Sequence, residues 1–174
     1  PLIVSLLVQS LYNIVDSIFV AKMSEEALTA TSLAFPVQML MIAFSVGTSV
    51  GVNALLSKTL GARNRERATK IANTSIMLAL INGAVFSLTG IFFAQKLARS
   101  FTTVESTAAL CADYLSICMI FCFGNFIETM LQRFLQAAGN TVLSMCSLIA
   151  GAVTNIILDP ILIFGLFGFP ALGI

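Results

Sequence analysis

The sequence predicts an all-α integral membrane protein. Hydrophobic residues make up 58% of the 174 residues and charged residues only 10%, whereas about a quarter of an average soluble domain is charged. The apolar residues also form stretches of about 20, the length that crosses the hydrocarbon core of a bilayer as a helix. We therefore predict five transmembrane helices, at approximately 1–22, 34–57, 71–95, 112–136 and 142–166.

The first span carries the most polar helix face. Gln9, Asn13 and Asp16 follow one another at i, i+4 and i+7, with Tyr12 on the flank of the same face, so we expect them to line a cavity. Pro1 precedes an apolar helix that lacks the basic start and the cleavage site of a signal peptide. We expect the chain to be part of a longer protein.

The second and third spans carry mostly packing signals. Pro36 is predicted in the first turn of the second span, where its missing N–H costs nothing, with Thr31 or Ser32 as the cap. Gly47 and Gly51 form a GxxxG pattern, which allows close helix packing. The remaining polar side chains are expected to bond neighbouring helices together: Ser45, Ser49, Asn53, Asn73, Asn82 and Ser87.

The fourth and fifth spans are joined by "AAGNT", residues 137–141, which predicts a helix end at Gly139 and a new start at Asn140 or Thr141. In the fifth span, Pro160 frees the carbonyl of Ile156 from its helical partner. Irregular backbone within a membrane is tolerated where it lines protein or water. Residues 155–160 are therefore predicted to border a hydrated chamber.

Basic residues predict the orientation. Residues 57–70 hold five basic side chains against one acidic side chain, whereas the loop after the first span holds one against two. The positive-inside rule places 57–70 in the cytoplasm, so the amino terminus and the turn at 137–141 are expected there too. The net charge of +1 gives no reason to expect nucleic acid as a partner. The expected partner is membrane lipid.

Three acids lie within spans, Asp16, Glu128 and Asp159. A charge at the bilayer centre costs about 2.5 to 3.5 kcal/mol, so each acid needs a partner, a wet cavity or a proton. Helical rise places Asp16 and Asp159 at similar depth, and Glu128 nearer the inner surface. Two readings stay open: the acids are functional, or they bond neighbouring helices, in the case of Glu128 by pairing with Arg133.

Other chemistry is restricted by composition. The sequence has no histidine, which excludes sites that depend on it. The four cysteines lack the spacing of metal ligands and are read as small packing residues: Cys111, Cys118, Cys122 and Cys146. We expect no cofactor and no resident metal.

Three segments resemble the amino-terminal lobe of the MATE (multidrug and toxic compound extrusion) transporters: "YNIVDSIFVAKMSEEALTATSLAFPVQML", "GTSVGVNALLSKTLGARNRERATK" and "LQAAGNTVLSMCSLIAGAVTNIILDPILIFGLFGFPALGI". The resemblance implies a twelve-helix fold of two six-helix lobes. Residues 1–174 would then supply five helices of the first lobe, and the carboxy-terminal lobe would be missing.

The resemblance also implies roles for single residues. The family's first-helix acid falls on Asp16, its fifth-helix amide and acid on Asn155 and Asp159, a polar first-helix residue on Gln9, and a bending proline on Pro1. Pro160 is a second candidate bending point, and Glu128 matches weakly a polar residue of the fourth helix. These positions largely coincide with those chosen from the cost of polar groups in a membrane.

The implied function is export of cationic amphipathic compounds in exchange for H⁺ or Na⁺, in the bacterial cytoplasmic membrane. Burial and a second nearby carboxylate both favour the neutral acid, so Asp16 and Asp159 could exchange protons near physiological pH. The metal ion that the resemblance implies is Na⁺, which we would expect at Asp16, Asn155 and Asp159. One alternative is a lipid-linked sugar flippase of the related superfamily, which would be expected to line its cleft with basic residues. An intramembrane aspartyl protease is another, suggested by the two aspartates and by Pro170, Ala171 and Leu172, but its GxGD motif is absent.

Overall fold

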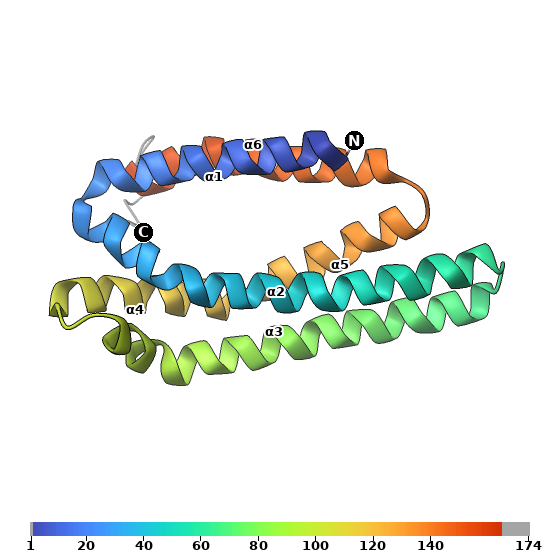
Figure 1. Cartoon of the computed structure of the whole chain (residues 1–174), viewed down its shortest axis with the longest axis horizontal. Helices are drawn as coiled ribbons and strands as arrows, with labels where there is room; N and C mark the ends of the chain where they lie inside the picture. Colours follow the sequence, from blue (N-terminus) through green and yellow to red (C-terminus); the bar gives the residue numbers. More distant parts are fainter. Residues whose placement is uncertain (1, 165–174) are drawn as a thin grey trace.

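The computed structural model describes residues 2–164, all of whose regular elements are helices: α1 (Leu2–Met23), α2 (Glu25–Gly61), α3 (Arg65–Phe101), α4 (Glu105–Ile120), α5 (Phe123–Ala137) and α6 (Thr141–Phe164) (Figure 1). Within α1 and α6 some side chains lie outside the description: residues 2, 5, 6, 12, 16, 19–23, 159, 160 and 162–164. The predicted all-α fold is confirmed for the part of the chain that is described.

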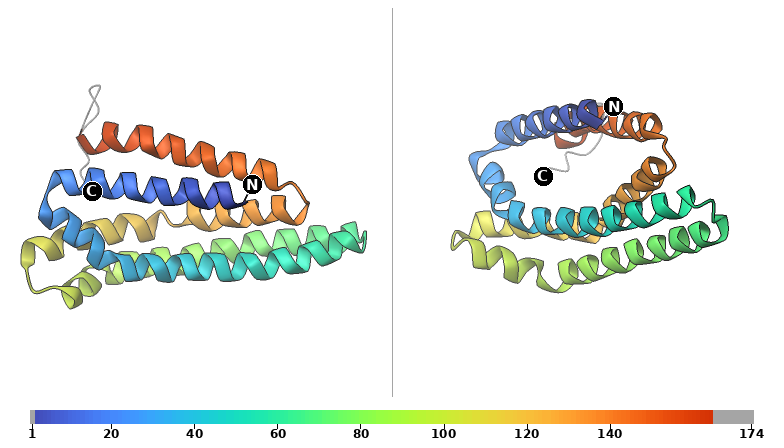
Figure 2. Two further views of the ribbon diagram at one scale, coloured as in Figure 1. Left: turned by 45° about the horizontal axis from the view of Figure 1, so that its top comes forward. Right: turned by 45° about the vertical axis from the view of Figure 1, so that its right-hand side comes forward.

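The helices form two layers (Figures 1 and 2). One layer consists of α1 and α6, which pack against each other, and the other is a bundle of α2, α3, α4 and α5. Short connections join the layers: Ser24 between α1 and α2, and residues 138–140 between α5 and α6. The layer of α1 and α6 therefore lies beside the bundle, with each of its helices tied to it at one end.

The length and hydropathy of the helices suit a membrane. Within the described residues, α2, α3 and residues Thr141–Leu158 of α6 are long and apolar enough to cross one, and α4 with α5 makes a fourth crossing if the bent pair is one span. At about 1.5 Å per residue, α2 and α3, each of 37 residues, reach about 55 Å. They are therefore longer than the hydrocarbon core, which is about 30 Å thick.

The start of α2 differs from the prediction. The helix begins at Glu25 with Ser24 as its cap, whose side chain accepts a hydrogen bond from the Ala27 N–H at 3.0 Å, so Pro36 lies in the helix interior and not in the first turn. Glu25 and Glu26 in the first turn further favour this earlier start through the helix dipole. The favourable cap at Ser24 outweighs the cost of a proline in the helix interior. The first part of α2 is bent relative to the longer part that lies beside α3 (Figure 1).

The predicted fourth span, 112–136, is wrong as a single helix. The chain forms α4 and α5 instead, with a bend of 44° between them. The Ile120 carbonyl at the break accepts a hydrogen bond from Ser87 Oγ of α3 at 3.2 Å. Cys122 Sγ donates a hydrogen bond to the Gly83 carbonyl of α3 at 3.5 Å. Tertiary contacts with α3 therefore stabilise a break that the uniformly apolar sequence conceals.

Two glycines of α3 receive the residues on either side of the break. A Cβ on Gly90 would lie 2.5 Å from the Met119 Cβ, and one on Gly83 would lie 2.6 Å from the Phe123 ring. A Cβ added to Gly47 or Gly51 of the GxxxG pattern would meet nothing within 4 Å among the described residues. The close helix contact expected of the GxxxG pair is therefore made by α3 instead.

Part of the core of the bundle is built mainly from small residues. One cluster joins α2, α3 and α4 through side chains that are almost fully buried: Ala30, Ala34, Ala94, Ala98, Cys111, Ala112 and Leu115. Small side chains allow helix backbones to approach closely, which replaces the hydrophobic effect as a source of packing energy in lipid. Cys111 and Cys122 are buried, as predicted for packing residues, whereas Cys146 is exposed and is not a core residue.

The turn between α5 and α6 matches its prediction. Gly139 has a φ of +82°, the left-handed conformation that glycine adopts without a Cβ penalty. The Asn140 N–H donates to the Leu135 carbonyl at 2.8 Å, and Asn140 Oδ1 accepts from the Leu143 N–H at 3.1 Å. Gly139 therefore ends one helix and Asn140 caps the next.

Candidate functional site

The polar stripe of α1 lies on an unbroken helix. Gln9 and Asn13 are exposed in the described structure, and the Asn13 carbonyl accepts a hydrogen bond from Ser17 Oγ at 2.8 Å. The side chains of Tyr12 and Asp16, and the whole of Pro1, lie outside the described residues. The backbone places position 16 on the same face as Gln9 and Asn13, seven residues after the first and three after the second.

The predicted partner residues lie on α6. Asn155 is exposed, and the side chains of Asp159 and Pro160 lie outside the described residues. The helix continues without interruption through residue 160. Because α1 and α6 pack together and run in the same direction (Figure 1), positions 16 and 159 belong to one layer. Their coupling and bending roles remain predictions.

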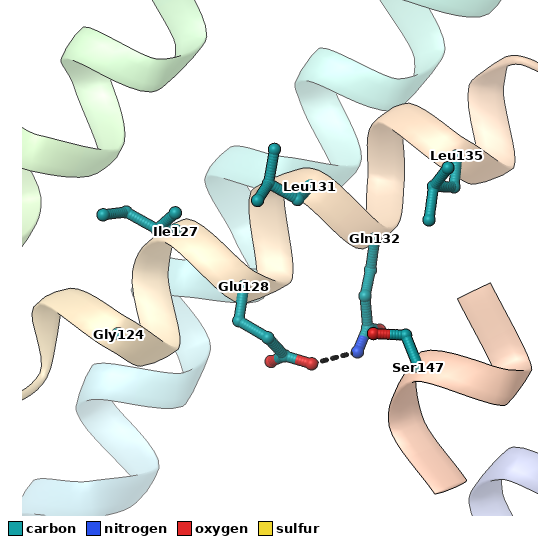
Figure 3. A pocket seen from close by; sticks show the side chains of 7 residues that line it. All are labelled: Gly124, Ile127, Glu128, Leu131, Gln132, Leu135 and Ser147. Carbon is teal, nitrogen blue, oxygen red and sulfur yellow. Dashed lines mark hydrogen bonds between the residues drawn. The ribbon is translucent and has the colours of Figure 1, made fainter. Parts of the chain in front are cut away.

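Glu128 lies in a separate hollow between α5 and α6, of about 260 Å³ (Figure 3). We call it the Glu128 hollow. Glu128 accepts a hydrogen bond from Nε2 of Gln132, one turn further along α5. The residues that complete its lining are largely apolar: Gly124, Ile127, Leu131, Leu135 and Ser147.

The alternative pairing of Glu128 with Arg133 is wrong. Five residues along a helix correspond to about 140° of rotation beyond a full turn, so the two side chains leave different faces of α5. Arg133 Nη1 donates to Gln136 Oε1 at 2.8 Å, and Gln136 Nε2 donates to Ser144 Oγ at 3.1 Å. Arg133 therefore helps to join α5 to α6, and Glu128 is the one charged residue among the described residues that line the hollow.

The bend between α4 and α5 positions the Glu128 hollow. α5 is turned by 44° from α4, packs against α2 and α3 of the bundle, and also contacts α6, which follows it in the chain. Phe126 and Met130 are buried on one face of α5, and Glu128 extends from another face toward the hollow (Figure 3). The amphipathic character of α5 thus separates its packing residues from the carboxylate.

One polar contact in the bundle was not predicted. Gln38 Nε2 of α2 donates to the Tyr114 hydroxyl of α4 at 2.8 Å, next to Cys118 Sγ at 3.9 Å. Tyr114 and Cys118 are four residues apart, on one face of α4, which is the only signal that the sequence carries for this contact. The two bonded residues are 76 positions apart in sequence.

The residues predicted to bond helices together behave differently from one another. Ser87 does so through the Ile120 carbonyl, whereas Ser49 donates to Val46 of its own helix. Three buried polar atoms have no hydrogen-bond partner in the described structure: Ser45 Oγ, Asn53 Oδ1 and Asn82 Nδ2.

No group of three or more acidic or cysteine side chains lies together among the residues that the structure describes. Two of the three proposed Na⁺ ligands, Asp16 and Asp159, fall outside them. The prediction of a Na⁺ site in the layer of α1 and α6 therefore remains open.

Fold and site together define a polytopic membrane protein with an acidic residue facing a hollow between its spans. The model of the MatE family matches residues 1–161. The chain therefore belongs to the MatE family.

Named relatives and solved structures agree with this assignment. The chain is 33% identical over its whole length to the probable multidrug resistance protein YoeA of Bacillus subtilis, covering 38% of that protein. It is 29% identical to an FAD transporter of Shewanella oneidensis, over 94% of the chain and 36% of the relative. A MOP superfamily transporter from Pyrococcus furiosus superposes with a TM-score of 0.88 at 31% identity, over 94% of the chain and 36% of that structure.

The chain thus spans between a third and two fifths of the length of these relatives. The relatives are transporters and a probable resistance protein, not enzymes. The family assignment excludes the intramembrane protease as the reading of the two aspartates.

Proposed function

We propose that the protein carrying this chain exports cationic, amphipathic compounds across the bacterial cytoplasmic membrane in exchange for H⁺ or Na⁺. The chain supplies most of one lobe, and a second lobe completes the transport pathway. Alternating access in such transporters requires the movement of one repeat against another. The resemblance to a multidrug resistance protein supports the class of cargo.

The observation that carries the choice of cargo is the lining of the Glu128 hollow. Its described lining combines one carboxylate, one amide, one hydroxyl and apolar side chains, with no basic residue among them. An organic cation with a hydrophobic body fits this lining, because the acid attracts its charge and the leucines cover its apolar part. Gln9, Tyr12 and Asn13 of α1 are proposed to line the cavity on the opposite side.

Coupling is proposed to depend on Asp16, Asn155 and Asp159. A proton, or Na⁺ held by the oxygens of these side chains, and a cationic substrate compete for the same negative charge. Binding of the ion changes the lobe, with bending near Pro1 and Pro160, and expels the substrate. The packing of α1 beside α6 supports this proposal because it places the three positions in one layer.

An anionic cargo is the second candidate, because one relative is described as an FAD transporter. The lipid-linked sugar flippase belongs to the same class of anionic cargo. Such a cargo requires basic side chains along its path, and the Glu128 hollow offers an acid instead. The test is efflux from a drug-sensitive bacterial host that expresses the full-length protein, with ethidium and FAD measured in parallel. Export of ethidium alone supports the proposal, and export of FAD alone contradicts it.

Glu128→Gln is expected to weaken the recognition of cations. The apparent KM for a cationic substrate should rise about tenfold, since the loss of one nearby opposite charge in a partly hydrated site is worth roughly 1.4 kcal/mol. Glu105→Gln is the matched control, because Glu105 is exposed at the far end of the bundle. Initial efflux rates over a range of substrate concentrations provide the measurement. An unchanged KM in Glu128→Gln would show that the Glu128 hollow is not part of the substrate pathway.

The orientation is also a proposal: residues 57–70 and 137–141 lie in the cytoplasm with the amino terminus. A membrane-impermeant maleimide should label a cysteine introduced at Asn64 only after permeabilisation of the cells, in a background from which the native cysteines have been removed. A cysteine at Thr103, between α3 and α4, should be labelled in intact cells. The reversed pattern would show the opposite orientation.

A further inference from the structure

The turn that joins α2 to α3 gathers most of the positive charge of the chain. We call residues 58–70 the hairpin tip. Glu66 is its only acid and is already paired with Lys70 at 2.7 Å. Four basic side chains remain, all exposed and with no acidic partner in the described structure: Lys58, Arg63, Arg65 and Arg67. The hairpin tip is therefore an unneutralised cationic surface.

The backbone of the hairpin tip fixes the position of its central arginine. Arg63 has a φ of 55°, a left-handed conformation that is unfavourable for a residue with a Cβ. Its N–H donates to the Leu60 carbonyl at 2.9 Å, and the next N–H, of Asn64, donates to the Thr59 carbonyl at 3.2 Å. Asn64 Oδ1 caps α3 by accepting from the Arg67 N–H at 3.0 Å. The main chain is thus held on both sides of Arg63.

Arg63 and Arg65 border a hollow of about 410 Å³ together with Leu60. Neither arginine side chain forms a hydrogen bond or an ion pair within the part of the chain that is described. Guanidinium groups match the geometry of phosphate oxygens and bind them with paired hydrogen bonds. Leu60 adds an apolar wall, which a soluble phosphate does not need but a lipid does.

The hairpin tip also begins where the apolar stretches of its two helices end. The apolar stretch of α2 ends just before Lys58, and that of α3 resumes at Ile71, so the basic side chains follow directly on the apolar segments. The tip is at the same end of the molecule as the turn between α5 and α6 (Figure 1). Anionic lipid phosphates at this boundary attract basic residues by about 1 kcal/mol for each side chain.

We propose that the hollow between Leu60, Arg63 and Arg65 binds the phosphate headgroup of an anionic phospholipid, held by the two guanidinium groups with its glycerol end against Leu60. The bound lipid anchors the end of the α2 and α3 pair to one leaflet. This site is separate from the Glu128 hollow and from the layer of α1 and α6. Its ligand is an anion, whereas the substrate proposed for the Glu128 hollow is a cation.

The test uses the purified full-length protein in detergent micelles, titrated with a fluorescent phosphatidylglycerol and, in parallel, with a phosphatidylcholine that carries the same label. We expect preferential binding of phosphatidylglycerol, weakened about 30-fold by Arg63→Gln with Arg65→Gln, the effect of two basic side chains. Lys96→Gln with Arg99→Gln is the matched control, since it removes the same charge at the far end of α3. Size-exclusion chromatography establishes that each variant is folded.

Equal binding of the two lipids, or an equal loss in the control variant, would overturn the proposal. Inorganic phosphate serves as the competitor that separates a lipid site from a site for soluble anions. Displacement of phosphatidylglycerol by millimolar phosphate would overturn the assignment to lipid, and retention of the lipid would support it.

Discussion

Asp16→Asn is expected to abolish coupled export by the full-length protein, with efflux of a fluorescent organic cation falling to the level of cells without the transporter. The amide has nearly the same shape as the acid but cannot exchange a proton and carries no charge for Na⁺. Asp159→Asn should have the same effect, because both positions belong to the layer of α1 and α6. Efflux is measured at matched protein levels in the membrane.

The control for this experiment is Asp113→Asn. Asp113 is an exposed acid of α4, in the other layer of the molecule, so its loss should leave efflux unchanged. A normal rate of export in Asp16→Asn and Asp159→Asn would show that these acids only join helices, and the coupling site would then lie elsewhere in the full-length protein. Loss of export in all three variants would point to a general effect of membrane acids on folding.

Gly90→Ala is expected to destabilise the bundle more than any other single methyl group added to a described glycine. The new Cβ would lie 2.5 Å from the Met119 Cβ, an atom next to the backbone that cannot move without shifting α4. Overpacking of this kind costs about 1 to 3 kcal/mol. The temperature at which half of the purified protein loses its monodisperse peak in size-exclusion chromatography should fall by several degrees.

Two further glycines calibrate this result. Gly83→Ala should cost less, because its nearest neighbour is the Phe123 ring, which can turn aside. Gly51→Ala should have little effect, since nothing lies within 4 Å of the added Cβ. If Gly51→Ala proved as damaging as Gly90→Ala, the GxxxG pattern of α2 would form a contact outside the described residues.

Some of the molecule can be predicted from residue patterns because the membrane imposes a cost on each polar group. The face of Gln9 and Asn13 and the end of α5 at Gly139 follow from local spacing and backbone conformation, and the structure confirms the turn. The exposed side-chain amides of Gln9 and Asn13 lie on α1, which corresponds to the first predicted span. These features depend on residues within one or two turns of each other.

The rest depends on contacts between distant segments. The break after Ile120 is stabilised by Ser87 and Gly83 of another helix, so no pattern within residues 112–136 reveals it. The bond from Gln38 to Tyr114 is hidden for the same reason. The small residues at 83, 87, 90, 94 and 98 of α3 do recur at helical spacing, and this stripe is the signal that could have identified the close contact with α4.

The two short connections between the layers restrict how the molecule can deform. α1 is tied to the bundle at its carboxyl end through Ser24, and α6 at its amino end through residues 138–140. Since α1 and α6 run in the same direction, these ties lie at opposite ends of the layer (Figure 1). Because the pair of α1 and α6 is tied at two opposite ends, it cannot slide along the bundle. The pair can still rotate about the line that joins the two connections. Rocking of this kind would change the width of the Glu128 hollow, which lies between α5 and α6, while the bundle of α2, α3, α4 and α5 stays fixed.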